Sequence, residues 1–224
     1  MKKIIAIVLA VSSLFFLTVS NALAEWSAGV SVSHGDYKAS GTETLKESGK
    51  ITKSSENGQF TYPSIFLEYN LGRVSLGLDV IPGSVSTEEV SRTDYNNVKG
   101  VPCTGNDGCG TGVTNKASVE LSRHVSLYAL VPIMDTGSFV RAAVMRADVN
   151  TKETLNTGST YPDKRIYGGT IGLGYQHDFG AGYVRAEVGH SEYEKLSLTS
   201  TNADNKVSAD LDGNFGRISI GRSF

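Results

Sequence analysis

The stretch Arg217-Ile218-Ser219-Ile220-Gly221-Arg222-Ser223-Phe224 ends the chain with an alternation of apolar and polar side chains. Successive side chains of a β-strand point to opposite faces, so Ile218, Ile220 and Phe224 share one face while Arg217 lies on the other. One face therefore suits an apolar solvent and the other does not. A strand with lipid on one side needs hydrogen-bonded neighbours on both edges, so the pattern predicts the closing strand of a β-barrel.

The first 24 residues have the pattern of a secretory signal peptide. Lys2 and Lys3 supply the positive charge, residues 4–19 are apolar, and Ala22-Leu23-Ala24 forms a small-residue cleavage site. The apolar stretch is short for a membrane-spanning helix, which needs about 20 residues. We therefore expect residues 1–24 to be removed on export and residues 25–224 to form one β-barrel domain.

The composition argues against a nucleic-acid-binding protein and in favour of an all-β fold. Removing Lys2 and Lys3 from the 21 basic residues leaves 19 against 23 acidic ones, a net charge of −4, which argues against nucleic acid as a partner. Glycine is abundant at 25 residues and proline scarce at 5. Useful helical periodicity is missing from the sequence, so we expect an all-β fold.

Alternating segments follow one another along the chain, separated by connections of unequal length. The long polar connections fall near residues 34–57, 84–116 and 150–164, with a shorter one near 202–205, whereas residues 70–73, 135–137 and 180–182 form tight turns. This alternation predicts an eight-stranded antiparallel transmembrane β-barrel with long external loops, short periplasmic turns and both ends in the periplasm. The predicted strands cover residues 26–33, 60–71, 74–80, 119–133, 140–144, 167–179, 184–188 and 217–224.

The segment before the last strand breaks the alternation. Val207, Ala209 and Leu211 have the opposite parity to Ile218 and Ile220. Either a β-bulge within residues 212–215 restores the register, or the earlier segment is loop.

The faces opposite the aliphatic rows carry charge. A soluble eight-stranded barrel such as a lipocalin has an apolar interior, so these charges favour a membrane barrel instead. Charges inside a narrow barrel must be paired, which predicts an ion-paired core, with a charge-lined pore as the alternative. The predicted interior network comprises Glu68, Asp79, Glu120, Arg141, Arg185, Glu187 and Arg217.

Cys103 and Cys109 lie in the second long polar segment and are the two cysteines of the chain. An exported chain meets an oxidising compartment, and the glycine-rich residues between them allow the backbone to bend back, so we expect a disulfide. Two thiols without histidine or further cysteine at ligand spacing do not predict a metal site.

The last strand, with Ile218, Ile220 and final Phe224, resembles the C-terminal signature of bacterial outer-membrane barrels, although Arg222 stands where an aromatic or aliphatic residue is usual. The spacing of strands and turns resembles the small barrels of the opacity and outer membrane protein A or X type over nearly all of residues 25–224. The resemblance implies the outer membrane of a Gram-negative bacterium, contact with outer-membrane lipid and lipopolysaccharide, a monomer without cofactor, and a last strand recognised by the barrel-assembly machinery.

Three functional hypotheses remain open at this point. The first is a structural or surface-interaction role, adhesion or recognition, through external loops held above a filled barrel. The second is a porin-like passage for small solutes. The third rests on His124 and Ser126, whose spacing resembles that of outer-membrane lipid A deacylases, although this face is the inward one. We expect the first, and no enzyme activity.

Overall fold

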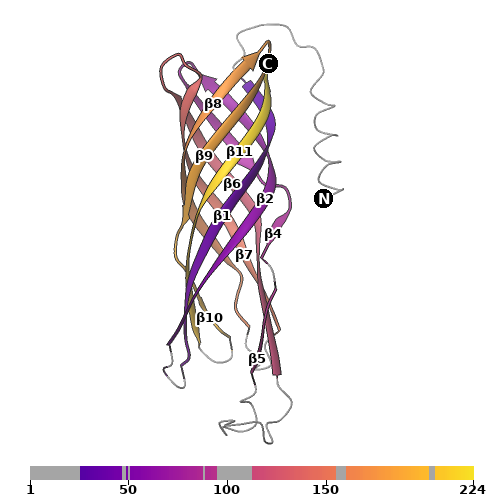
Figure 1. Ribbon diagram of the computed structural model, residues 1–224, viewed down its shortest axis with the longest axis vertical. Coiled ribbons are helices and arrows are strands. Elements are labelled where there is room, and N and C mark those ends of the chain that lie inside the picture. Colours follow the sequence, from indigo (N-terminus) through magenta and orange to yellow (C-terminus); the bar gives the residue numbers. More distant parts are fainter. Residues whose placement is uncertain are drawn as a thin grey trace, which may run out of the picture.

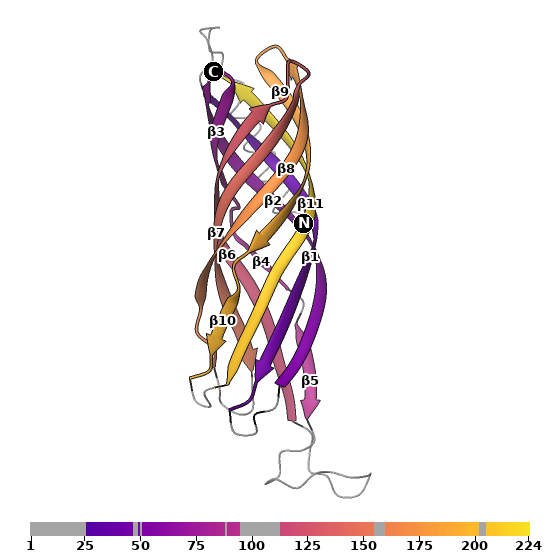
Figure 2. The same cartoon turned by 90° about the vertical axis from the view of Figure 1, so that its left-hand side faces the viewer.

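The computed structural model describes residues 26–46, 49, 51–87, 89–94, 113–154, 160–201 and 205–224. The expected signal peptide and both cysteines lie outside these residues, so cleavage and the Cys103–Cys109 disulfide stay predictions. Figure 1 shows one tall cylinder of tilted strands, and the view in Figure 2 shows the same closed wall from the side.

The regular secondary structure of the described residues consists of β-strands joined by turns and short irregular segments. The strands are β1 (Trp26–Thr44), β2 (Ile51–Leu71), β3 (Val74–Val80), β4 (Ser84–Ser86), β5 (Val90–Asp94), β6 (Val113–Pro132), β7 (Ser138–Thr154), β8 (Lys164–Phe179), β9 (Gly182–Tyr193), β10 (Leu196–Thr199) and β11 (Lys206–Ser223). Within the described ranges, no helix is long and apolar enough to cross a membrane.

The sheet closes into a ring with eight strand positions. Their order is β1-β2-β3-β6-β7-β8-β9-β11, and β11 pairs with β1 to close the ring. Short strands continue two of these positions toward the loop side. β4 and β5 continue the position of β3 and pair with β6, and β10 continues the position of β9 and pairs with β11. Neighbouring strands are antiparallel, as in the ladder between β1 and β2. The predicted antiparallel barrel is confirmed.

An apolar belt surrounds the half of the barrel nearest the short turns. Ile218 and Ile220 are 58 % and 52 % exposed, as predicted from their parity. Ser219, which lies between them, and Arg217, which precedes them, are buried. Aromatic side chains gather where the belt meets the turn end, and the rings of Trp26 and Tyr69 lie 4.8 Å apart. The belt consists of outward side chains including Val32, Ile65, Leu67, Leu76, Leu78, Leu127, Val144, Tyr167, Ile171, Leu173, Val188, Ile218 and Ile220.

The strands extend well beyond this belt on the loop side. Crossing a membrane takes about 9–11 tilted residues, but β1 has 19 residues and β2 has 21. Most of the long connection predicted at residues 34–57 is strand, since the ladder between β1 and β2 continues to Thr44 and Ile51. Likewise β4 and β5 lie inside the connection predicted at 84–116. Pairing satisfies the backbone of these polar stretches, whose side chains alone suggested loops.

The extended part of the barrel encloses an apolar cluster. The register of β11 against β1 is continuous over its whole length, so neither the bulge expected at residues 212–215 nor a loop before it is present. Instead Leu211 points inward and packs against the cluster. The cluster comprises Met145, Ala147, Val149, Ile166 and Tyr193, with Tyr37, Val119, Leu121, Leu196 and Leu211 packed against it.

A β-bulge in β6 explains why Val119 and Leu121 belong to that cluster. We expected them to share a face with Val125, but the pairing with β7 shifts between Ser122 and Val125. One extra residue in a strand sends all later side chains to the opposite face. Val119 and Leu121 therefore point into the barrel while Val125 and Leu127 point outward.

The seam between β1 and β11 depends on close backbone approach at Gly29. A Cβ atom at Gly29 would lie 2.3 Å from the Ile220 carbonyl oxygen and 2.8 Å from the Gly221 Cα. The same Cβ atom would lie 2.3 Å from the Phe66 ring, so both the paired strands and this buried ring would have to move. At Gly216 on the same seam, the space for a Cβ atom is open within 4 Å.

We therefore expect Gly29→Ala to weaken ring closure and Gly216→Ala to leave it unchanged. The temperature at which each folded barrel loses its distinct mobility on a detergent gel measures the effect. Gly29→Ala should lower this temperature clearly. Equal transition temperatures for both variants would contradict the seam geometry.

Candidate functional site

The lumen holds a buried ion pair between Glu68 of β2 and Arg185 of β9. The Arg185 Nη1 and Nη2 atoms donate to the two carboxylate oxygens of Glu68 at 2.7 and 3.1 Å, a bidentate arrangement. Tyr128 and Tyr183 donate their hydroxyls to the same carboxylate at 2.6 and 3.2 Å, and Ser27 adds a hydrogen bond at 3.2 Å. Glu68 is 1 % exposed. This carboxylate is thus fully paired although it is removed from water.

A second ion pair joins Asp79 of β3 to Arg217 of β11. Ser64 donates to Asp79 at 3.1 Å, and Arg217 Nη2 also donates to the hydroxyls of Ser31 and Ser64 at 2.7 and 2.9 Å. The pair spans β1 and β2, which lie between β11 and β3 in the ring. It therefore crosses the lumen and ties four strand positions together.

The third ion pair, between Arg141 of β7 and Glu187 of β9, is less completely satisfied. Arg141 Nη1 donates to Glu187 at 3.3 Å, and the Arg141 guanidinium lies 4.0 Å from the centre of the Tyr128 ring. Arg141 Nε and one oxygen of Glu187 are buried and have no hydrogen-bond partner among the described residues. The cation–π contact with Tyr128 offsets part of the desolvation of this guanidinium.

Aromatic side chains fill the space around these pairs. Phe66, Tyr128, Leu130, Phe139 and Tyr183 form one buried cluster at this level. The Arg185 guanidinium lies 4.9 Å from the Tyr183 ring centre and 5.3 Å from that of Phe139. An eight-stranded barrel has an interior just wide enough for its own side chains, and here large side chains occupy it.

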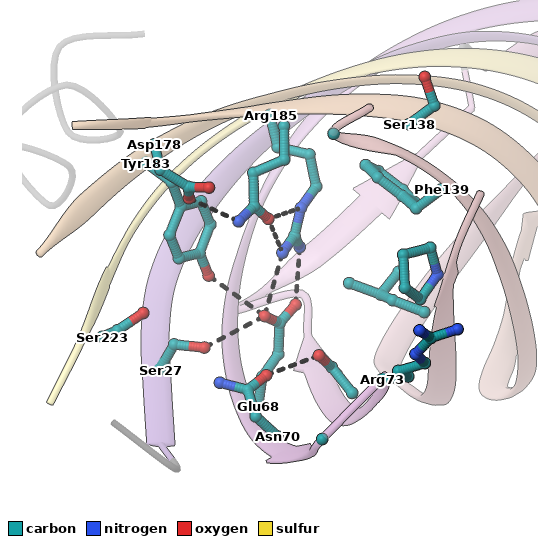
Figure 3. Close-up of a pocket in the computed structure, with 16 residues that line it drawn as sticks. Ser27, Glu68, Asn70, Arg73, Ser138, Phe139, Asp178, Tyr183, Arg185 and Ser223 are labelled. Atoms are coloured by element: carbon teal, nitrogen blue, oxygen red, sulfur yellow. Dashed lines mark hydrogen bonds and ion pairs between the residues drawn. The ribbon is translucent and has the colours of Figure 1, made fainter. Parts of the chain in front are cut away.

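Cavities lie at two levels of the lumen, among the residues that the structure describes. The larger, about 200 Å³, lies at the turn end, where Arg73 and Asp178 border it and Glu68 and Arg185 form its inner wall. Figure 3 shows Glu68 at the centre of this wall, held by Ser27, Tyr183 and Arg185. The smaller, about 30 Å³, lies further inside, and the two cavities share no lining residue among the described parts of the chain.

His124 and Ser126 both line the smaller cavity. His124 Nε2 lies 3.0 Å from the Tyr193 hydroxyl, and within the described part of the chain its buried Nδ1 atom has no partner. Asp79 lines the same space but pairs with Arg217. Since a water molecule needs roughly 10–15 Å³ of such volume, the cavity has room for a water or two and excludes a lipid acyl chain. This geometry does not support the deacylase hypothesis.

Glu120 is a correction to the predicted interior network. The bulge in β6 turns Glu120 to the outer face, where it forms an ion pair with Lys152. The hydrogen bond from Lys152 lowers the pKa of the Glu120 carboxyl, which lies beyond the apolar belt. The structure places the other six predicted residues, Glu68, Asp79, Arg141, Arg185, Glu187 and Arg217, together in the lumen.

Sequence reasoning missed the aromatic and amide partners of the network. Tyr128 and Tyr183 alternate with outward aliphatic residues of their strands, so their parity already placed them inside. Gln176 accepts hydrogen bonds from Arg185 at 2.7 and 3.1 Å. Over the residues that the structure describes, no group of three or more histidine, cysteine, aspartate or glutamate side chains is arranged to hold a metal ion.

Comparison with known proteins identifies the fold. The sequence matches no family model and no curated protein. Among solved structures, the outer membrane protein OprG of Pseudomonas aeruginosa is similar with a TM-score of 0.50 and 12 % identity, over 90 % of this chain and 96 % of that one. The protease OmpT of Escherichia coli has a TM-score of 0.47 and 11 % identity, over 92 % of this chain and 99 % of that one. The attachment invasion locus protein Ail of Yersinia pestis has a TM-score of 0.37 and 9 % identity, over 86 % of this chain and 99 % of that one.

At such low identity these likenesses concern the fold alone. The match to OprG, together with the closed ring and the outward apolar belt, gives this chain the fold of an outer-membrane β-barrel protein. The resemblance to small outer-membrane barrels predicted from the last strand is confirmed at this level.

Removing one partner of the Glu68–Arg185 pair should be strongly destabilising. Arg185→Met leaves the Glu68 carboxylate buried without its counter-ion, which typically costs about 3–5 kcal/mol. The double variant Glu68→Met/Arg185→Met should recover most of this loss, because it leaves no unpaired charge. Urea unfolding of the barrel in lipid vesicles, followed by gel mobility, gives the free energies.

The exposed pair between Lys195 and Asp210, whose atoms lie 3.2 Å apart, provides the control. Lys195→Met should change the free energy of unfolding little, since water screens both charges. If Arg185→Met were as mild as Lys195→Met, Glu68 would have to be hydrated and the lumen open to water.

Proposed function

We propose that this protein is an integral outer-membrane barrel of a Gram-negative bacterium whose lumen is filled and whose loop-side wall and loops serve a structural or surface-interaction role. The observation that carries the proposal is the set of three buried ion pairs across the lumen, Glu68–Arg185, Asp79–Arg217 and Arg141–Glu187. They occupy the space that a conducting channel would need.

The length of the wall supports the same role. β1 contributes the outward residues Ala28, Val30 and Val32 to the belt, and its remaining residues up to Thr44 continue beyond it. The apolar cluster inside this extension gives it a core of its own, independent of lipid. A rigid wall that carries loops away from the membrane suits contact with external molecules.

A passage for small solutes is the alternative. It would require a continuous path between the two cavities, whereas Arg141, Asp79 and Arg217 border one and Glu68 and Arg185 the other. We infer that the pathway is closed in this conformation. Recording across planar bilayers distinguishes the two functions.

Purified protein in planar bilayers should show conductance near zero. Arg141→Ala should produce small, flickering channels, because it removes a large side chain and leaves Glu187 without its partner, which draws water into the lumen. Lys152→Ala, on the outer face, should remain silent. Large, steady channels from the unsubstituted protein would overturn the filled-lumen proposal in favour of solute passage.

Phe224 should matter for assembly more than for folded-state stability. Its side chain faces lipid at the turn end, and its backbone N–H donates to the Trp26 carbonyl at 2.9 Å. Phe224→Ala keeps that hydrogen bond and removes only the ring of the proposed assembly signal, which also includes Ile218 and Ile220. Surface levels in cells should fall, while refolding of the purified chain into vesicles should be nearly unchanged.

Phe179 offers a matched control, since it is another exposed aromatic at the turn end. Phe179→Ala should leave surface levels close to normal. Equal loss for both variants would assign Phe224 to the aromatic belt alone and remove the assembly role.

A further inference from the structure

A group of three arginines lies on the outer face of the barrel, just beyond the apolar belt on the loop side. Arg165 of β8 is directly opposite Asp148 of β7 in the ladder, and Arg146 lies two residues before Asp148 on the same face. Arg123 of β6 reaches the same carboxylate, with Nη2 at 2.5 Å from Asp148. We call Arg123, Arg146, Arg165 and Asp148 the arginine cluster.

The cluster carries an excess of positive charge. The Asp148 carboxylate accepts from Arg165 Nε at 3.1 Å, and this hydrogen bond lowers the pKa of Asp148. Arg123 and Arg165 contact this carboxylate, and Arg146 adds a third positive charge that interacts with it. Arg123 and Arg165 remain 72 % and 48 % exposed at their side chains, whereas Asp148 is 9 % exposed. The arginines cover the acid and present their remaining donors outward.

The bulge in β6 places Arg123 in this position. Arg123 has a φ of 49°, a left-handed conformation that is uncommon for residues other than glycine. Arg123 and His124 together oppose Ala147, so one extra residue is fitted at this point of the ladder. His124 points into the lumen while Arg123 turns out toward Asp148. Bulges commonly re-aim a side chain in this way.

The depth of the cluster is set by the belt beside it. Arg146 is opposite Val125 in the ladder with β6 and opposite Tyr167 in the ladder with β8. Val144 lies on the same face, two residues closer to the apolar belt, and is 65 % exposed. Two residues of strand span roughly 7 Å. The arginines thus lie where the hydrocarbon gives way to headgroups. Glu194, which accepts from the Tyr167 backbone N–H at 3.2 Å, borders the cluster on its far side.

We propose that the arginine cluster binds the phosphate of an anionic lipid headgroup, such as the phosphorylated glycolipid of the outer leaflet. The proposal rests on the proposed outer-membrane location. Guanidinium groups bind phosphate oxygens through paired hydrogen bonds, and their attachment to three adjacent strands fixes the geometry of the site. The neighbouring Tyr167 and Val144 offer an apolar surface for the start of the acyl chains.

Binding of fluorescent lipid A to folded protein in zwitterionic detergent tests this, with dephosphorylated lipid A as the matched ligand. Each arginine near a membrane surface contributes about fivefold in affinity, so Arg123→Gln should weaken binding of the phosphorylated lipid about fivefold and the triple Gln variant about one hundredfold. Asp148→Asn should strengthen it. Dephosphorylated lipid should bind the triple variant and the unsubstituted protein equally.

Lys38→Gln and Lys53→Gln together form the control, since both lysines are exposed on β1 and β2, on the opposite side of the ring. This control should keep full affinity; equal weakening would indicate general electrostatic attraction and overturn the site. Unchanged affinity in the triple variant, or equal affinity for dephosphorylated lipid, would also overturn it. Full competition by inorganic pyrophosphate would assign the cluster to a small soluble anion and reject the lipid.

A change in gel mobility on boiling in detergent tests the membrane barrel independently of lipid binding. Each variant should show different mobilities before and after boiling. If the triple variant failed this test, the single Arg123→Gln variant, which changes a side chain that is 72 % exposed, would decide the proposal by its affinity. An unsubstituted protein without heat modifiability would contradict the membrane barrel itself, whatever its lipid affinity.

Discussion

The structure depends on the requirement that every strand in lipid has hydrogen-bonded neighbours on both edges. Pairing of β11 with β1 meets this requirement by closing the ring. Closure at eight strand positions fixes a narrow lumen, and a narrow lumen leaves little room for water to solvate charge. The inward charges must therefore find one another across the barrel. The close approach of strands at Gly29 and the pairing of Glu68 with Arg185 both follow from this constraint.

The lumen is organised in levels along the barrel axis. Near the turns lies the larger cavity, which ends at Glu68 and Arg185. Beyond it come the other two ion pairs, then the small cavity at His124, and finally the apolar cluster around Val149 and Ile166. Charge is thus concentrated where lipid surrounds the wall, and apolar side chains fill the part that extends beyond it. This arrangement stabilises the barrel and its extension by different means.

Much of the belt-side barrel could be predicted from sequence, because period-two alternation assigns side chains to faces. Parity placed Ile218 and Ile220 on one face and Arg217 on the other, and the charge of Arg217 marked its face as the interior at this end. The same reasoning placed Glu68 and Arg185 in one interior. Turn chemistry also helped: Gly72, with a φ of 70°, ends the ladder between β2 and β3 where a tight turn was expected.

The loop-side half could not be predicted in the same way. Alternation tells which residues share a face but not which face is inside, so Leu211 suggested a bulge where the interior had simply become apolar. The real bulge, at Arg123 and His124, leaves no local signal such as glycine, and it reversed the placement of Glu120. Polar stretches of β1 and β2 resembled loops because their pairing depends on the backbone and not on side-chain type.

The proposed role at the cell surface rests on a lumen that side chains occupy and water does not cross. Proton exchange at the arginine side chains measures this directly, since NMR of the folded protein in micelles resolves guanidinium N–H groups. We expect the Arg217 and Arg141 N–H protons to exchange with water far more slowly than those of Arg123, which lies on the outer face. Rapid exchange at Arg217 and Arg141, equal to that at Arg123, would contradict a closed lumen.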